Sequence, residues 1–298
     1  MNRGTLAAIG AYGLWGVLPV YWKLIQTVPA IEILFHRMIW SLLFLIVLLS
    51  LRNQWQWFTK IWRDRRVLIS FTGSALLLAI NWFTYIYAVN SNHVVEASLG
   101  YFINPLLNVL LGVFILRERP RRWQWVAIGI AGLGVLYLTI QYGQLPWISL
   151  TLAITFALYG LLRKTAPLGS LSGLSLEMMF LFLPALGFLI YFESAGVAHF
   201  GHARLSINLL LAFTGVATAL PLLLFAYGAQ RVMLSTIGIL QYTAPTLQFL
   251  LGVFVYKEPF DTVRLIGFVL VWSALIIYST DMILLQRNRR RAESYAVE

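Results

Sequence analysis

Long apolar runs dominate this chain of 298 residues, and their length constrains the fold more than any other feature. A helix needs about 20 apolar residues to cross the hydrocarbon core of a bilayer. Backbone polar groups in lipid must be paired within the protein, so apolar runs of this length form helices. The sequence predicts ten spans, at residues 4–24, 30–51, 66–89, 94–116, 123–141, 146–163, 172–194, 205–228, 232–256 and 263–285.

Composition and charge distribution favour a membrane protein over a nucleic-acid-binding protein. The chain is 60% hydrophobic and 11% charged, with a formal net charge of +11, whereas soluble domains are about 25% charged. With the N-terminus in the cytoplasm, 17 of the 22 lysines and arginines lie in cytoplasmic segments and 4 on the other side. This distribution follows the positive-inside rule and predicts that both termini are cytoplasmic. The basic, tryptophan-rich segment Arg52–Arg66 is interpreted as an anchor to membrane lipid rather than a nucleic-acid site.

One stretch of the sequence occurs twice. Residues Glu96–Glu118 align with Thr236–Glu258 at an offset of 140 positions, with Pro105 and Pro245 at the same place. An odd number of spans in each half gives the halves opposite orientations in the membrane. We therefore predict an all-α polytopic membrane protein, with ten helices forming a five-plus-five inverted repeat around a central cavity. The predicted units are residues 1–142, residues 143–286 and a basic cytoplasmic tail at 287–298.

Each copy of the repeated stretch carries its proline at mid-depth. The proline removes one helix hydrogen bond and frees the carbonyl one turn earlier, at Tyr101 or Gln241. A freed carbonyl is costly in lipid unless it is buried in protein or faces a water-filled cavity. Two broken helices in matching halves indicate the central site of a small-molecule transporter.

Four ionisable side chains inside the predicted spans or at their starts are candidates for a functional role. Arg37 costs roughly 2.5–3.5 kcal/mol in hydrocarbon, so it should face protein or water, either at a substrate site or locking two helices together. His36 is a weaker candidate, because a lone helix histidine is often packing. Glu96 could pair with Arg37, hold the other end of a zwitterionic substrate, or stabilise its helix start. Glu177 is either a solvated helix-start residue or a gate residue. Transport could be coupled to protons carried by Glu96, His36 or Glu177, or it could be facilitated without coupling.

Polar and aromatic side chains share helix faces at mid-depth. Tyr101, Asn104 and Asn108 follow helical spacing, and Gln241 and Gln248 repeat that spacing in the second half. Such groups either line a cavity or form hydrogen bonds between helices, worth about 0.6–2 kcal/mol each. The candidate substrate-binding residues are Arg37, His36, Asn81, Trp82, Tyr85, Glu96, Tyr101, Asn104, Gln241, Tyr242 and Trp15.

The sequence carries no pattern typical of catalysis. It contains no cysteine, its four histidines lack metal-ligand spacing with carboxylates, and it has no phosphate-binding lysine loop. We expect neither enzymatic activity nor a cofactor or metal. The segment Gly129–Gly134 lacks the spacing of a dinucleotide fingerprint and is interpreted as small residues that allow close helix packing.

The sequence resembles the drug/metabolite transporter superfamily, whose ten-span permeases contain two EamA domains. Within it, the chain is most similar to the RarD-type, chloramphenicol-sensitivity branch of bacterial inner membranes. The resemblance covers nearly the whole chain and depends on EILFHR at Glu32–Arg37, Asn81-Trp82, EASLGYFINP at Glu96–Pro105, LYGLLRK at Leu158–Lys164, Leu234-Ser235-Thr236, Gln241-Tyr242 and Pro245-Thr246. It implies a multi-pass inner-membrane location and transport of small organic metabolites or drugs.

The expected function is therefore a secondary transporter, most simply an exporter, that works by alternating access. Its expected partners are a small-molecule substrate and membrane lipid, with no nucleic acid and no obligatory protein partner. Two other classes stay open: a membrane-embedded enzyme acting on a lipid-linked substrate, and a non-transporting accessory subunit. Scattered single carboxylates argue against the enzyme.

Overall fold

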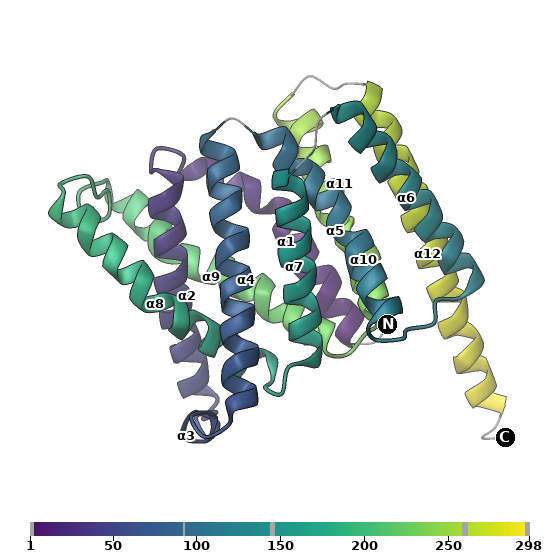
Figure 1. Ribbon diagram of the computed structural model, residues 1–298, viewed down its shortest axis with the longest axis horizontal. Helices are drawn as coiled ribbons and strands as arrows, with labels where there is room; N and C mark the ends of the chain where they lie inside the picture. The colour runs from purple at the N-terminus through teal and green to yellow at the C-terminus, as the bar shows by residue number, and fades with distance from the viewer. Residues whose placement is uncertain (1–2, 92, 144–146, 258–261, 296–298) are drawn as a thin grey trace.

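The computed structural model describes the chain except residues 1–2, 92, 144–146, 258–261 and 296–298. At residues 89–90, 94–96, 142, 264 and 286–295 it describes the backbone only. Every regular element in the described part is a helix (Figure 1). The elements are α1 (Arg3–Leu24), α2 (Ala30–Leu51), α3 (Phe58–Ile61), α4 (Arg65–Asn90), α5 (Val94–Phe114), α6 (Arg122–Tyr142), α7 (Trp147–Thr165), α8 (Ser170–Ser194), α9 (Leu205–Ala229), α10 (Leu234–Gln241), α11 (Thr243–Leu250), the π-helical turn η1 (Leu251–Val255) and α12 (Thr262–Tyr295).

These helices confirm the predicted class, an all-α polytopic membrane protein. Among the described residues, nine helices are long and apolar enough to cross a membrane, with α10 to η1 counted as one. The remaining long helix, α7, packs against α4 and α5 inside the bundle. Each predicted span coincides with one of these elements. The five-plus-five inverted arrangement stays a prediction.

The packing of the helices is similar when the two halves are exchanged. Helix α1 packs on α9 as α7 packs on α4, and α2 packs on α9 as α8 packs on α4. Helices α6 and α12, which would be equivalent, pack against each other at one edge of the bundle (Figure 1). Arg117 and Lys257, 140 positions apart, both adopt the left-handed conformation, with φ of 55° and 53°. Such a conformation is uncommon outside glycine, so its recurrence supports the duplication.

The two proline-containing helices differ. Helix α5 continues through Pro105 as one helix, whereas its counterpart divides at Tyr242 into α10 and α11. Pro245 then lies in the first turn of α11, where a backbone N–H has no intrahelical partner to lose. The predicted break is therefore present in the second half, while in α5 the rest of the hydrogen-bond ladder carries the helix past the proline.

Small residues allow close approach at some helix crossings but not throughout Gly129–Gly134. A Cβ on Gly134 would lie 3.1 Å from the Leu270 Cβ on α12. Gly129 and Gly132 have no such neighbour within 4 Å, so the packing interpretation is wrong for these two glycines within this chain. The tight crossings lie elsewhere: a Cβ on Gly238 of α10 would overlap the carbonyl of Pro105 on α5. This crossing brings the two repeated stretches together at the centre of the bundle.

Candidate substrate-binding cavity

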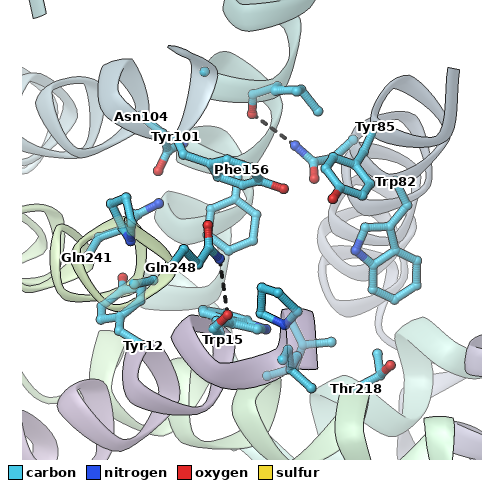
Figure 2. Close-up of a pocket in the computed structure, with 18 of the residues that line it drawn as sticks. Tyr12, Trp15, Trp82, Tyr85, Tyr101, Asn104, Phe156, Thr218, Gln241 and Gln248 are labelled. Carbon is cyan, nitrogen blue, oxygen red and sulfur yellow. Dashed lines mark hydrogen bonds between the residues drawn. The ribbon is translucent and has the colours of Figure 1, made fainter. Parts of the chain in front are cut away.

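A cavity of about 190 Å³ lies between the two halves of the chain (Figure 2). Its lining residues belong to helices of both halves, so neither half forms it alone. These helices are α1, α2, α4, α5, α7, α9, α10 and α11. Its lining residues are Tyr12, Trp15, Leu18, Pro19, Trp22, Arg37, Asn81, Trp82, Tyr85, Gly100, Tyr101, Asn104, Leu152, Phe156, Thr218, Leu222, Gln241, Ala244, Pro245 and Gln248.

The cavity occupies one end of the bundle rather than its full height. On α1 it is lined from Tyr12 to Trp22, toward the C-terminal end of that helix. On α5 its lining residues, Gly100 to Asn104, belong to the N-terminal half. The cavity therefore extends from the middle of the bundle toward the end opposite the N-terminus.

Arg37 brings a positive charge to the wall of this cavity. It is about two turns from the start of α2, and its Nε donates a hydrogen bond to Thr218 Oγ1 on α9 at 2.9 Å. The guanidinium carbon lies 5.0 Å from the ring centroid of Trp22 and 4.7 Å from that of Trp82. Two aromatic faces at these distances stabilise the cation. Arg37 takes part in none of the ion pairs found in the described part of the chain.

Four amide side chains also line the cavity, and each is held by a hydrogen bond. Asn81 Nδ2 donates to the Leu152 carbonyl at 2.9 Å, and Asn104 Nδ2 donates to the Ala153 carbonyl at 2.6 Å. Gln248 Nε2 donates to the Trp15 carbonyl at 3.1 Å. Gln241 Oε1 accepts a hydrogen bond from Asn108 Nδ2 at 3.0 Å. The amides thus tie helices together around the cavity, so both roles considered from the sequence occur at once.

Aromatic rings form most of the remaining wall. The rings of Tyr85 and Tyr101 lie 6.2 Å apart, and those of Trp15 and Phe156 lie 5.7 Å apart. Figure 2 shows these rings around the hollow, with Tyr12 and Gln241 on the opposite side from Trp82. A largely aromatic wall with a few fixed polar groups is typical of a small-molecule site.

The structure brings eight of the predicted site residues together on this cavity: Arg37, Asn81, Trp82, Tyr85, Tyr101, Asn104, Gln241 and Trp15. Two others lie away from it. Tyr242 is fully buried and donates a hydrogen bond to the Phe102 carbonyl at 3.2 Å. His36 is buried against the Phe200 ring, with centroids 4.9 Å apart. The side chain of Glu96 lies outside the described residues.

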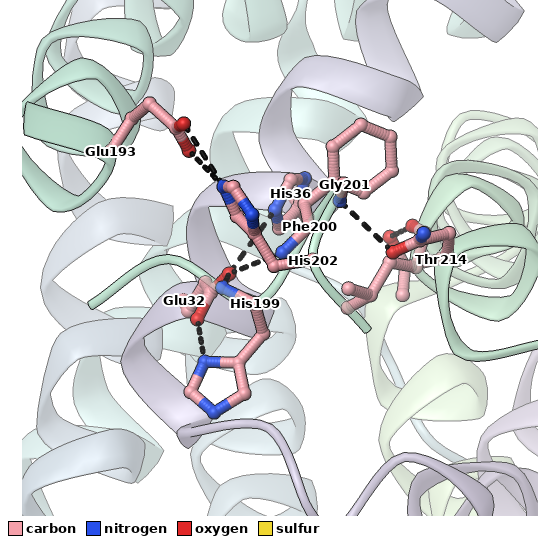
Figure 3. A network of polar contacts seen from close by, with 10 residues as sticks. Glu32, His36, Glu193, His199, Phe200, Gly201, His202 and Thr214 are labelled. Carbon is pink, nitrogen blue, oxygen red and sulfur yellow. Dashed lines mark hydrogen bonds and ion pairs between the residues drawn. The ribbon is translucent and has the colours of Figure 1, made fainter. Parts of the chain in front are cut away.

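His36 belongs to a polar cluster at the α8–α9 loop (Figure 3). Glu32, at the start of α2, accepts hydrogen bonds from the backbone N–H groups of His199 and Phe200 at 2.7 and 3.2 Å. It also contacts His199 Nδ1 at 2.8 Å, and the Nε2 of His36 lies 3.8 Å from its carboxylate. This cluster fastens the loop to α2, which favours packing as the role of His36.

Sequence reasoning missed several lining residues, including Tyr12, Trp22, Phe156 and Thr218. Tyr12 and Trp22 share a helix face with Trp15, so helical spacing from that tryptophan would have found them. Thr218 carries no such signal, because only the fold places it beside Arg37.

A second buried polar group lies toward the end of the bundle nearer the N-terminus. Glu177 on α8 is fully buried and accepts hydrogen bonds from Ser74 Oγ at 2.5 Å and the Tyr159 hydroxyl at 3.2 Å. Arg163, also fully buried, approaches the same carboxylate at 3.5 Å and donates to the Ser170 carbonyl at 3.1 Å. Glu177 is therefore not a solvated helix-start residue; this arrangement closes α4, α7 and α8 against one another.

The helices define a multi-pass membrane protein, and a cavity lined by aromatic, amide and cationic side chains lies between its two halves. The model of the EamA-like transporter family matches residues 2–140 and 146–280, one match in each half, and the chain belongs to this family. The resemblance proposed from the sequence is thereby confirmed, and the protein is a multi-pass inner-membrane protein of transporter type.

Individual relatives agree with this assignment. The chain is 47% identical to Protein RarD of Streptomyces exfoliatus, over 99% of this chain and 94% of that protein. It is 43% identical to the uncharacterized transporter YojE of Bacillus subtilis (strain 168), over 95% of each. A solved crystal structure shares the fold with a TM-score of 0.71 and 19% identity, covering 95% of this chain and 98% of the other.

Proposed function

We propose that the protein is a secondary transporter that exports small organic metabolites or drugs across the inner membrane by alternating access. The observation that carries this proposal is the cavity, which is built by both halves and contains a charged side chain at membrane depth. An ionisable group inside a membrane span is costly, and such groups mark substrate pathways.

Alternating access requires a closed side and an open side. The ring centroids of Phe156, Tyr159 and Phe225 lie within 6 Å of one another, and Phe156 also lines the cavity. The buried Glu177–Arg163 pair lies next to this aromatic cluster, since Tyr159 donates a hydrogen bond to Glu177. With the predicted topology, this barrier faces the cytoplasm and the cavity faces outward. We propose that the two halves rock about the cavity, separating this aromatic barrier in the opposite state.

The substrate would be recognised by the eight predicted residues that line the cavity. Arg37 would hold a charged end, the amides and Tyr85 would hydrogen-bond polar groups, and Trp15 and Trp82 would pack against an apolar body. Glu96 stays a proposed partner for an opposite charge. Proton coupling through Glu96, His36 or Glu177 also stays a proposal, beside facilitated transport.

The experiment begins with a metabolite-wide thermal-shift screen on purified protein, because ligands of the native state raise its stability. Compounds that bind are then used for flux measurements in proteoliposomes. We expect flux in Arg37→Ala and in Asn104→Ala to be at least about tenfold lower than in wild type. Arg37→Ala removes a charge-assisted contact, and Asn104→Ala removes a buried polar group that holds the cavity wall. Arg66→Ala and Gln54→Ala remove an arginine and a side-chain amide at exposed positions and should transport normally.

Two results would count against the proposal. Wild-type flux in both cavity variants would show that the site is wrong. Chemical conversion of a bound compound without any movement across the bilayer would instead favour an enzyme.

A further inference from the structure

We propose that the transported substrate is a small organic anion: a ring-sized apolar body with a carboxylate that binds the terminal nitrogens of Arg37. This inference rests on the proposed transport function and adds the chemical class of the substrate.

The first step is the state of the Arg37 side chain. Its Nε already donates a hydrogen bond to Thr218 Oγ1, and neither terminal nitrogen has a hydrogen-bond partner among the described residues. Among the arginine nitrogens of the described residues, Arg163 Nε is the one that is buried and has no hydrogen-bond partner. The unpartnered terminal nitrogens of Arg37 are therefore not fully buried. The guanidinium edge is thus open to the cavity, and such an edge matches a carboxylate with two parallel hydrogen bonds.

The second step is the charge balance of the cavity. Its described lining contains one cation and no aspartate or glutamate. The amide nitrogens of Asn81 and Asn104 each already donate a hydrogen bond to a backbone carbonyl of α7. A cation in a low-dielectric wall that has no counterion among the described lining residues favours an anionic ligand, because the ligand supplies the opposite charge.

The third step is the shape of the rest of the site. Trp22 and Trp82 flank the guanidinium and fix its direction. Trp15, Tyr101 and Phe156 add further aromatic rings to the lining of the cavity. An apolar cavity of about 150 Å³ can hold one benzene ring. A volume of about 190 Å³ therefore fits a single ring with a short acid side chain.

The test compares four compounds at neutral pH on the purified full-length protein, by isothermal titration calorimetry. They are 3-phenylpropanoate, its neutral amide 3-phenylpropanamide, its cationic analogue 3-phenylpropan-1-amine, and propanoate, which lacks the ring. We expect 3-phenylpropanoate to bind saturably. The amide and the amine should bind about 10- to 100-fold more weakly, the usual size of a charge-assisted interaction.

Arg37→Gln should bind the acid and the amide alike, whereas Arg66→Gln, at an exposed position, should keep the wild-type preference. Should Arg37→Gln fail to fold, Thr218→Val provides a second test. It keeps the charge but removes the Nε acceptor, and should lower the acid-to-amide ratio severalfold. Equal binding of acid and amide by wild type, tighter binding of the amine, or no binding of any of the four would overturn the inference.

Flux in proteoliposomes separates this inference from the proposed function. Arg37-independent transport of a neutral or cationic compound would refute the anion class and leave the transporter standing. Arg37-dependent binding of 3-phenylpropanoate, without flux of it or of any compound from the screen, would support the site and refute transport.

Discussion

The carboxylate of Glu118 accepts hydrogen bonds from Ser235 and thereby caps helix α10, which begins at Leu234. Oε2 accepts hydrogen bonds from the Ser235 backbone N–H at 2.9 Å and from its hydroxyl at 2.7 Å. Oε1 accepts the Leu234 N–H at 2.6 Å and lies 3.8 Å from Lys164 Nζ. The first N–H groups of α10 have no intrahelical partners, so Glu118 joins the end of the first repeated stretch to the start of the second.

Replacing this cap should destabilise the bundle. In Glu118→Gln the side-chain amide donor would face a backbone donor, leaving one helix N–H unpaired in a nearly buried site. We expect the free energy of unfolding to fall by about 1–3 kcal/mol, measured by denaturant unfolding in mixed micelles. Glu193→Gln is the matched control, since Glu193 is exposed and contacts His202 at the surface; it should change stability by less than about 1 kcal/mol. Equal losses in both variants would contradict the capping role.

The buried pair of Arg163 and Glu177 leads to a second prediction. Removing one partner leaves an uncompensated buried charge, so Arg163→Met and Glu177→Gln should each cost about 3–5 kcal/mol of unfolding free energy. The double variant buries no isolated charge and should lose less than the sum of the two. A double-mutant cycle measures this coupling. Additive losses would show that the two groups do not stabilise each other.

The apolar runs predicted the helices well because membrane-spanning segments must satisfy their own backbone groups. Charge counting was less informative about side chains: Arg163 is one of the 17 basic residues counted in cytoplasmic segments, and it is fully buried against Glu177. Its partner comes from α8, and sequence spacing cannot show which helices meet. The same limit explains why Arg37 could be predicted at a cavity while Thr218, which orients it, could not.

Duplication helped to separate scaffold from site. Glutamate occurs at the equivalent positions 118 and 258, and such a recurrence favours a scaffold role. The cap that Glu118 forms on α10 is a role of this kind. Its counterpart Glu258 lies outside the described residues. Arg37 is not duplicated and lines the cavity.

A third prediction concerns the close crossing of α2 and α9. A Cβ on Gly215 would overlap the carbonyl of Trp40 and lie 2.7 Å from the Ser41 backbone nitrogen. Backbone atoms cannot move aside as a flexible side chain can, so Gly215→Ala should cost at least about 1–3 kcal/mol. Gly129→Ala places the same methyl group in open space and should be neutral or raise stability by up to about 1 kcal/mol, since alanine favours helix. Thermal unfolding in detergent compares the two; similar midpoints would mean that α2 and α9 do not approach this closely.

The last prediction concerns the opposite orientation of the two halves. Arg119 and Lys257 are exposed and lie at the equivalent ends of the two repeated stretches. The chain has no native cysteine, so Arg119→Cys and Lys257→Cys each introduce a single reactive thiol. In intact cells, a membrane-impermeant maleimide should label Lys257→Cys and spare Arg119→Cys until the membrane is opened. Arg66→Cys and Val197→Cys serve as the matched cytoplasmic and outer references. Labelling of Arg119→Cys and Lys257→Cys from one compartment would place both ends of the repeat on the same side, and two halves with the same orientation could not expose the cavity to each face by rocking.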